Sequence, residues 1–164
     1  YGTTGIEVRT AKDGLTIYVN ESNGVSELSF ADIKGIYTGK ITNWKDVGGS
    51  YAPIIIYGRE NSSGTYAFLK EVVLENEDYS NSMQALPGTA AVVNAVKSDA
   101  KGIGFGGAGY AKGVKEIAVR KGPSEQAYKP SSENVASGNY PITRFLYFYL
   151  RAKPDGDPKV FINW

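Results

Sequence analysis

Hydrophobic positions along the chain fall into short segments with either strand-like or helix-like spacing. Leu15, Ile17 and Val19 recur at every second position, which is typical of a β-strand with one buried face. Residues 5–19 are therefore predicted to be extended, with an interruption at Lys12-Asp13-Gly14. The other predicted strands are a β-branched, fully buried segment at 53–57, a glycine-rich strand or turn at 102–110, a short strand at 117–119 and an aromatic strand at 143–150.

Helix-like spacing marks three further segments. Residues 29–39 begin with a capping-box-like Ser-Phe-Ala-Asp sequence and end at a glycine stop. Residues 64–75 carry apolar side chains four positions apart, which predicts an amphipathic helix. Another helix is predicted to begin at Pro87-Gly88-Thr89. Residues 41–49, which include Trp44, follow neither period and are predicted to be an irregular surface segment.

The alternation of strands and helices predicts an α/β fold with a mainly parallel sheet flanked by helices. Residues 22–120 contain most of these elements and are predicted to form one complete α/β lobe. Residues 1–21 and 121–164 flank that lobe and contribute two strands that belong together outside it. No internal repeat is found.

Composition excludes several classes of protein. The chain has 164 residues, a formal net charge of +1 and no long run of one sign, which argues against nucleic acid as a partner. Histidine and cysteine are both absent, so Cys nucleophiles, thiolate zinc sites and His-dependent triads are excluded. No window is apolar over the length of a membrane span.

The stretch YGRENSSGTYAFLKE places Arg59 at the end of a predicted buried strand, just before a predicted helix. The first amides of a helix lack intrahelical partners, and the helix dipole adds about half a positive charge there, so this junction favours an anion. Ser63 and Thr65 add hydroxyl donors, and Gly64 lets a ligand approach the backbone closely. Arg59 can bind a tetrahedral oxyanion with two N–H groups. The alternative is that Ser62 or Ser63 is only an N-cap and that Arg59 pairs with a surface carboxylate.

Other motifs carry weaker signals. Ser62, Gly88 and Thr89 are additional candidates for anion contact, and for Gly88 and Thr89 the alternative is simple helix capping after Pro87. The GIGFGG segment at 102–107 matches G-x-G-x-x-G, but the residues after it form a poor helix, which favours a structural strand over a dinucleotide site. No P-loop motif, nucleophile–base pair or metal cluster is found. We therefore expect no catalytic residue, cofactor or metal, and no enzymatic activity.

Several segments together resemble the phosphate-binding proteins that serve bacterial ABC-type phosphate importers. The similarity extends in order through AKDGLTIYVNESN, LSFADIKGIYTGKITNWKDVGG, RENSSGT, LPGTAAVVNAV, KGIGFGGAGYA and ENVASGNYPITRFLYFYL. The resemblance implies a type II periplasmic-binding-protein fold, with two α/β lobes joined by crossing strands. It also implies inorganic phosphate as ligand, a membrane permease as partner and a location outside the cytoplasm, with lipoprotein anchoring left open. Arg59, Ser63, Gly64 and Thr65 match the family's phosphate contacts from the second lobe.

The chain departs from the family pattern at its N-terminus. Almost nothing precedes Asp13, whereas the family has a segment there that supplies the other wall of the cleft and a carboxylate acceptor for protonated phosphate. We therefore expect the second lobe plus the crossing strands, which would bind the remaining lobe or a second copy through residues 1–20 and 140–164. Binding of another tetrahedral oxyanion, or a structural or interaction role, is the alternative function.

Overall fold

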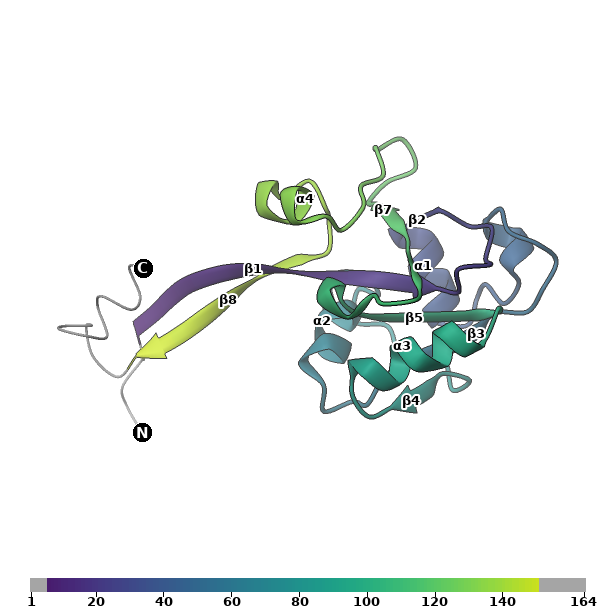
Figure 1. The fold of residues 1–164 in the computed structure, drawn as a ribbon, viewed down its shortest axis with the longest axis horizontal. Coiled ribbons are helices and arrows are strands. Elements are labelled where there is room, and N and C mark those ends of the chain that lie inside the picture. Colours follow the sequence, from purple (N-terminus) through teal and green to yellow (C-terminus); the bar gives the residue numbers. More distant parts are fainter. Residues whose placement is uncertain (1–5, 151–164) are drawn as a thin grey trace. The chain divides into compact units, whose positions relative to one another are not determined.

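The structure is a computed structural model that describes residues 6–150 (Figure 1). The described chain forms two compact units, one of Gly14–Thr143 and one that contains residues 6–13 and 144–150. The elements, in chain order, are β1 (Ile6–Val19), β2 (Glu27–Ser29), α1 (Phe30–Tyr37), the 3-10 helix η1 (Trp44–Val47), β3 (Ile55–Arg59), α2 (Gly64–Val72), β4 (Gln84–Leu86), α3 (Thr89–Ser98), β5 (Gly102–Gly107), the 3-10 helix η2 (Ala108–Tyr110), β6 (Lys115–Glu116), β7 (Ala118–Arg120), α4 (Ser132–Ser137) and β8 (Thr143–Leu150).

The main sheet of the larger unit has the strand order β4-β3-β5-β1-β6. β3 runs parallel to β4 and β5, whereas β1 runs antiparallel to β5 and β6. A separate parallel pair is formed by β2 and β7. The sheet is therefore mixed, and only its β4-β3-β5 part is parallel as the sequence predicted. Parallel pairing requires a crossover connection, and α2 and α3 supply one on either side of β4.

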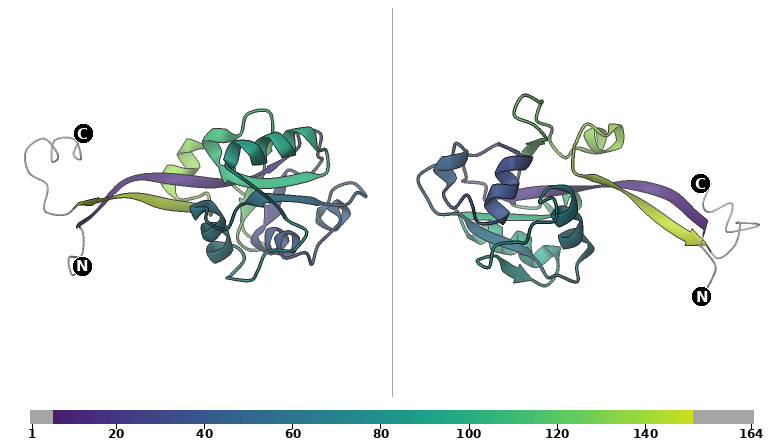
Figure 2. Two further views of the ribbon diagram at one scale, coloured as in Figure 1. Left: turned by 90° about the horizontal axis from the view of Figure 1, so that it is seen from below. Right: turned by 180° about the vertical axis from the view of Figure 1, so that it is seen from behind.

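Helices cover both faces of this sheet (Figures 1 and 2). On one face, α3 buries Val92, Val93 and Val96. On the other, α1 and α2 contribute Ile33 and Leu69 to the larger hydrophobic core. The three helices begin close to the predicted positions, and α1 and α2 end within three residues of theirs, because each has the expected local signals. In α1, for example, the backbone N–H of Asp32 donates to the Ser29 hydroxyl, and the Asp32 carboxylate accepts from the Ser29 backbone N–H, which completes a capping box.

The course of β1 differs from the prediction in two ways. The strand is continuous through residues 12–14, where an interruption was expected. Moreover, residues 14–19 are buried on both faces, not on one. Ile17 contributes to the larger core and Tyr18 to the smaller core beneath α3, so the strand lies between two apolar layers. Two-sided burial of a central strand removes the polar alternation on which the one-face prediction depended.

Other boundaries also require correction. β3 begins at Ile55, two residues later than expected, and alternates between buried and half-buried residues. Trp44 was expected on the surface, but its side chain is 1% exposed and lies in the larger core. The larger unit also includes residues 14–21 and 121–143, which the sequence analysis grouped with the flanking segments.

β8 pairs with β1, as predicted. The side-chain contacts of this pair lie at the beginning of β1, where the Thr10 hydroxyl donates to the Leu146 carbonyl at 3.1 Å and Arg144 forms an ion pair with Asp13 at 3.2 Å. The expected partner segment was residues 14–20, but Leu15–Val19 pairs with β5 instead. The remainder of the predicted flanking segments, residues 1–5 and 151–164, lies outside the described residues.

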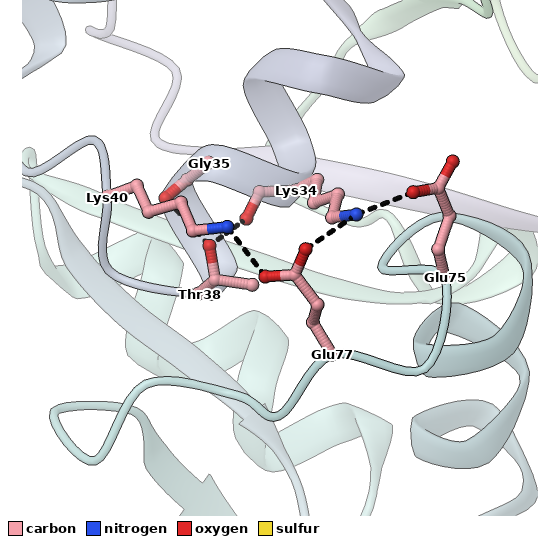
Figure 3. A network of polar contacts seen from close by, with 6 residues as sticks. All are labelled: Lys34, Gly35, Thr38, Lys40, Glu75 and Glu77. Carbon is pink, nitrogen blue, oxygen red and sulfur yellow. Dashed lines mark hydrogen bonds and ion pairs between the residues drawn. The ribbon is translucent and has the colours of Figure 1, made fainter.

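A network of ion pairs joins α1 to the loop that follows α2 (Figure 3). Lys34 contacts Glu75 at 2.6 Å and Glu77 at 2.8 Å, and Lys40 contacts Glu77 at 2.6 Å. Hydrogen bonds from Lys34 and then Lys40 lower the pKa of Glu77 to about 2. The carboxylate is therefore ionised at neutral pH, and the network links the two segments over 37 or more positions of sequence.

Candidate anion-binding site

The sheet brings two helix N-termini to the same edge. In the parallel pair of β3 and β4, Arg59 lies opposite Leu86. Helix α2 begins at Gly64 after a short turn, and α3 begins at Thr89 soon after β4 ends. Because the carboxyl ends of parallel strands meet at one edge, both helices begin at that edge, where the helix dipole favours an anion.

The guanidinium group of Arg59 is held from two sides. Its Nε and Nη2 atoms donate to the two carboxylate oxygens of Glu60, at 3.2 and 2.8 Å. Its Nη1 atom donates to the Thr89 hydroxyl at 2.9 Å. A guanidinium has five N–H groups, and three of them donate to Glu60 and Thr89 within the described residues. The other two can donate to a ligand. The Arg59 side chain is 15% exposed and so remains within reach of solvent at this edge.

The start of α2 is capped by Ser63. The Ser63 side chain is the N-cap and accepts a hydrogen bond from the Thr65 backbone N–H at 3.2 Å. Because the hydroxyl oxygen accepts this bond, its own proton can be donated to a ligand. Ser63 is buried, Thr65 is half-buried, and Ser62 and Gly64 are exposed. The structure therefore supports the capping role that the sequence offered as an alternative, and that role leaves a donor on the same residue.

The start of α3 is different because it lacks a side-chain cap. Gly88 is the N-cap residue, with φ of 84°. This left-handed backbone favours glycine, which has no Cβ to clash. The next residue, Thr89, uses its hydroxyl to hold Arg59. Thr89 was a secondary candidate in the sequence, and the structure places it in contact with the principal one.

Charge within the site is dominated by the Arg59–Glu60 pair. Hydrogen bonding to Arg59 lowers the pKa of Glu60 to about 2, and the same contact raises the pKa of Arg59. A lowered carboxyl pKa means that the pair is ionised at all pH values above about 2 and loses its charge complementarity only below that value. At neutral pH the two charges offset each other, so attraction of an anion depends on the directed N–H groups and on the helix ends.

Sequence reasoning missed the role of Glu60. The alternative in which Arg59 pairs with a carboxylate is partly realised, since the partner is the adjacent residue. The contact with Thr89, 30 positions away, goes beyond that alternative. The sequence did contain a signal for the Arg59–Glu60 pair, because a basic and an acidic residue are adjacent at the end of a strand. No local signal indicated Thr89 as the second partner of Arg59.

The described residues do not favour a dinucleotide site at the GIGFGG segment. The GIGFGG segment is β5, and the residues after it form the short 3-10 helix η2 instead of the α-helix that a dinucleotide site requires. Within residues 6–150, no group of three or more acidic, His or Cys side chains could hold a metal ion. None of the helices in that part of the chain has the length and hydrophobicity that a membrane span requires.

Comparison with protein families gives a match over the whole chain. Residues 1–164 match the family model described as a PBP superfamily domain. The chain belongs to the PBP superfamily. Its fold is that of the type II periplasmic binding proteins, in agreement with the expectation from sequence.

Several relatives of this PBP superfamily chain are named for phosphate binding or phosphate transport. The phosphate-binding protein PstS of Pseudomonas aeruginosa is 32% identical over 168 residues, which cover 94% of this chain and 52% of that relative. A crystal structure from Clostridium perfringens, described as a phosphate ABC transporter substrate-binding protein with bound phosphate, has a TM-score of 0.82 at 30% identity and covers 96% of this chain and 64% of that one. The crystal structure of an ABC-type phosphate transport receptor from Vibrio cholerae has a TM-score of 0.79 at 28% identity. The match covers 98% of this chain and 65% of that one. The chain spans about half the length of the curated relatives it matches.

Proposed function

We propose that this chain binds inorganic phosphate at the carboxyl edge of β3 and β4, as the solute-binding component of an ABC-type importer. The observation that carries the proposal is the Arg59 guanidinium, fixed by Glu60 and Thr89 beside the capped start of α2. Two relatives named for phosphate, one of them with phosphate bound, support the choice of ligand. The proposal places the protein outside the cytoplasm, with a membrane permease as its partner.

Within the site, Arg59, Ser63, Gly64 and Thr65 are the proposed phosphate ligands. Arg59 supplies charged N–H donors, Ser63 and Thr65 supply hydroxyl groups, and the first turn of α2 supplies amides. Thr89 is assigned mainly to Arg59, whose hydrogen bond it accepts. We propose no catalytic step, because binding needs only donors and the sequence has neither histidine nor cysteine to serve as a base or nucleophile.

Titration with inorganic phosphate, followed by amide NMR, tests the proposed site. We expect the signals of Gly64 and Thr65 to shift first, with an affinity weaker than about 1 μM, because donors at one open edge face water and gain modest net energy. Submicromolar binding by the isolated monomer would contradict the expected weakness. Absence of any shift at these residues up to tens of millimolar would overturn the proposed site. Sulfate is the comparison ligand, and an equal response would assign the site to tetrahedral oxyanions in general.

We further propose that the ribbon of β1 and β8 binds either the remaining lobe or a second copy of the chain. The sequence suggested residues 1–20 and 140–164 for this role. Residues 14–19 are buried, and the exposed residues of β8 lie between 145 and 149, so the described part of the proposed surface consists of residues 6–12 and 145–149. Its exposed apolar side chains are Ile6, Phe145, Leu146, Phe148 and Tyr149, which are 38–69% exposed. A two-stranded ribbon is marginal in water, and its open edges can pair with another chain.

Light scattering at micromolar concentration tests this association. We expect the chain alone to self-associate and the variant Phe145→Ser/Phe148→Ser to be monomeric, because loss of these rings removes apolar area from the ribbon. The matched control is Tyr51→Ser, which removes an aromatic ring that is 84% exposed in the larger unit. A strictly monomeric parent chain, with residues 6–12 well protected from hydrogen exchange, would contradict the proposal.

A further inference from the structure

The strand β5 approaches α3 closely because it has glycines on the face that the helix covers. A Cβ atom added to Gly104 would lie 2.6 Å from a methyl carbon of Val92. A Cβ atom added to Gly106 would lie 2.3 Å from Thr89 Cγ2 and 3.1 Å from the Tyr18 hydroxyl oxygen. Distances below 3.0 Å are essentially never found for real Cβ atoms, so the contacting side chains of α3, or the helix itself, would have to shift if either residue had a side chain.

The side chain of Thr89 joins Gly106 to the proposed anion site. Thr89 Cγ2 rests against the β5 backbone at Gly106, while Thr89 Oγ1 accepts the hydrogen bond from Arg59. Both atoms are attached to the same Cβ, and a β-branched side chain is stiff about χ1. A displacement of Cγ2 therefore displaces Oγ1 as well, and with it the acceptor for Arg59.

We propose that Gly106 is a positioning residue for the anion site, because only a residue without a side chain lets Thr89 hold Arg59 in its present orientation. The inference rests on the proposed function, which assigns Arg59 to the ligand. Glu60 fixes Nε and Nη2, and Thr89 fixes Nη1, so the two partners together define the plane of the guanidinium. Recognition by this planar group depends on its orientation, and support from neighbouring residues determines how well that orientation is kept.

The variant Gly106→Ala tests the proposal in the 164-residue chain. We expect the affinity for inorganic phosphate to fall by about ten- to a hundredfold, which is typical of losing the support of a binding group. Adding Thr89→Ser should restore affinity to within about threefold of Thr89→Ser alone, because serine keeps the hydroxyl and lacks the clashing methyl group. The new Cβ would also lie 3.1 Å from the hydroxyl oxygen of the buried Tyr18, which has to move by a few tenths of an ångström in both variants that carry Gly106→Ala.

Gly104→Ala is the matched control. It introduces the same methyl group on the same face of the same strand, but its clashes are with Val92 and Val96 and not with Thr89. A general loosening of the interface between α3 and the sheet would affect both variants, whereas positioning of Arg59 predicts a large effect of Gly106→Ala alone. An equal loss of affinity in Gly104→Ala, or no rescue by Thr89→Ser, would overturn the proposal.

A readout that does not depend on phosphate separates this inference from the proposed function. The Nε–Hε NMR signal of Arg59 reports the surroundings of the guanidinium in the free chain. We expect it to shift in Gly106→Ala, to return in Gly106→Ala/Thr89→Ser and to be unchanged in Gly104→Ala, even if the parent chain binds no phosphate. If Gly106→Ala does not fold, Thr89→Val carries the test, since it keeps the shape of Thr89 and removes the acceptor. An unchanged Arg59 signal in the folded variant would overturn the proposal.

Discussion

Replacing Arg59 with alanine should weaken the binding of inorganic phosphate by about a hundredfold or more. A hydrogen bond to a charged group contributes about 1.5–3 kcal/mol, so loss of two such donors costs about 3 kcal/mol or more, and 1.4 kcal/mol corresponds to tenfold in affinity. The substitution also leaves the ionised carboxylate of Glu60 without its partner beside the bound anion. NMR titration extends to the millimolar range in which the variant is expected to bind.

Two further variants separate the causes of that loss. Arg59→Ala/Glu60→Gln removes the unpaired negative charge. The gain in phosphate affinity over Arg59→Ala measures the repulsion by Glu60, and the remaining difference from the parent chain measures the lost donors. Arg120→Ala is the matched control, because Arg120 is also a partly exposed arginine paired with a carboxylate, that of Glu27. Retention of phosphate affinity by Arg59→Ala, or an equal loss in Arg120→Ala, would show that Arg59 is not the principal ligand.

Local signals in the sequence were enough to predict α1 and the two helices of the site, α2 and α3. Ser29 and Asp32 form the expected capping box, and Ser63 caps α2 where the strand-to-helix transition was expected. Helix α3 begins at Thr89, where the Pro87-Gly88-Thr89 signal placed it. Each of these features depends on residues within a few positions of one another, and such patterns are visible in a single sequence.

Contacts set by the tertiary structure were not predictable in the same way. Thr89 reaches Arg59 because parallel pairing places the end of β3 beside the end of β4, and that register is not encoded in either segment alone. Gly106 was assigned to a structural strand, but its partner in α3 could not be identified from the glycine pattern. The burial of Trp44 was missed because a single turn of 3-10 helix has too few residues to show a hydrophobic period.

Trp44 provides the largest expected effect on stability. Its indole ring is 1% exposed within the larger core, and Nε1 donates to the Lys101 carbonyl at 3.0 Å. Truncation to alanine removes the buried ring, leaves a cavity where the backbone can only partly relax, and takes the donor from that carbonyl. We expect Trp44→Ala to lower the free energy of unfolding by about 3–5 kcal/mol, the range typical of such substitutions.

Urea denaturation followed by far-UV circular dichroism measures this loss. Tyr51→Ala is the control for removal of a nearby aromatic residue, since Tyr51 is 84% exposed and its substitution should change the free energy of unfolding by no more than about 0.5 kcal/mol. Trp44→Phe keeps an aromatic ring but loses the hydrogen bond to the Lys101 carbonyl. Its loss of unfolding free energy should therefore fall between those of Trp44→Ala and Tyr51→Ala. If Trp44→Ala and Tyr51→Ala unfold at the same urea concentration with the same slope, Trp44 does not belong to the core, and the segment is a surface one as its sequence first indicated.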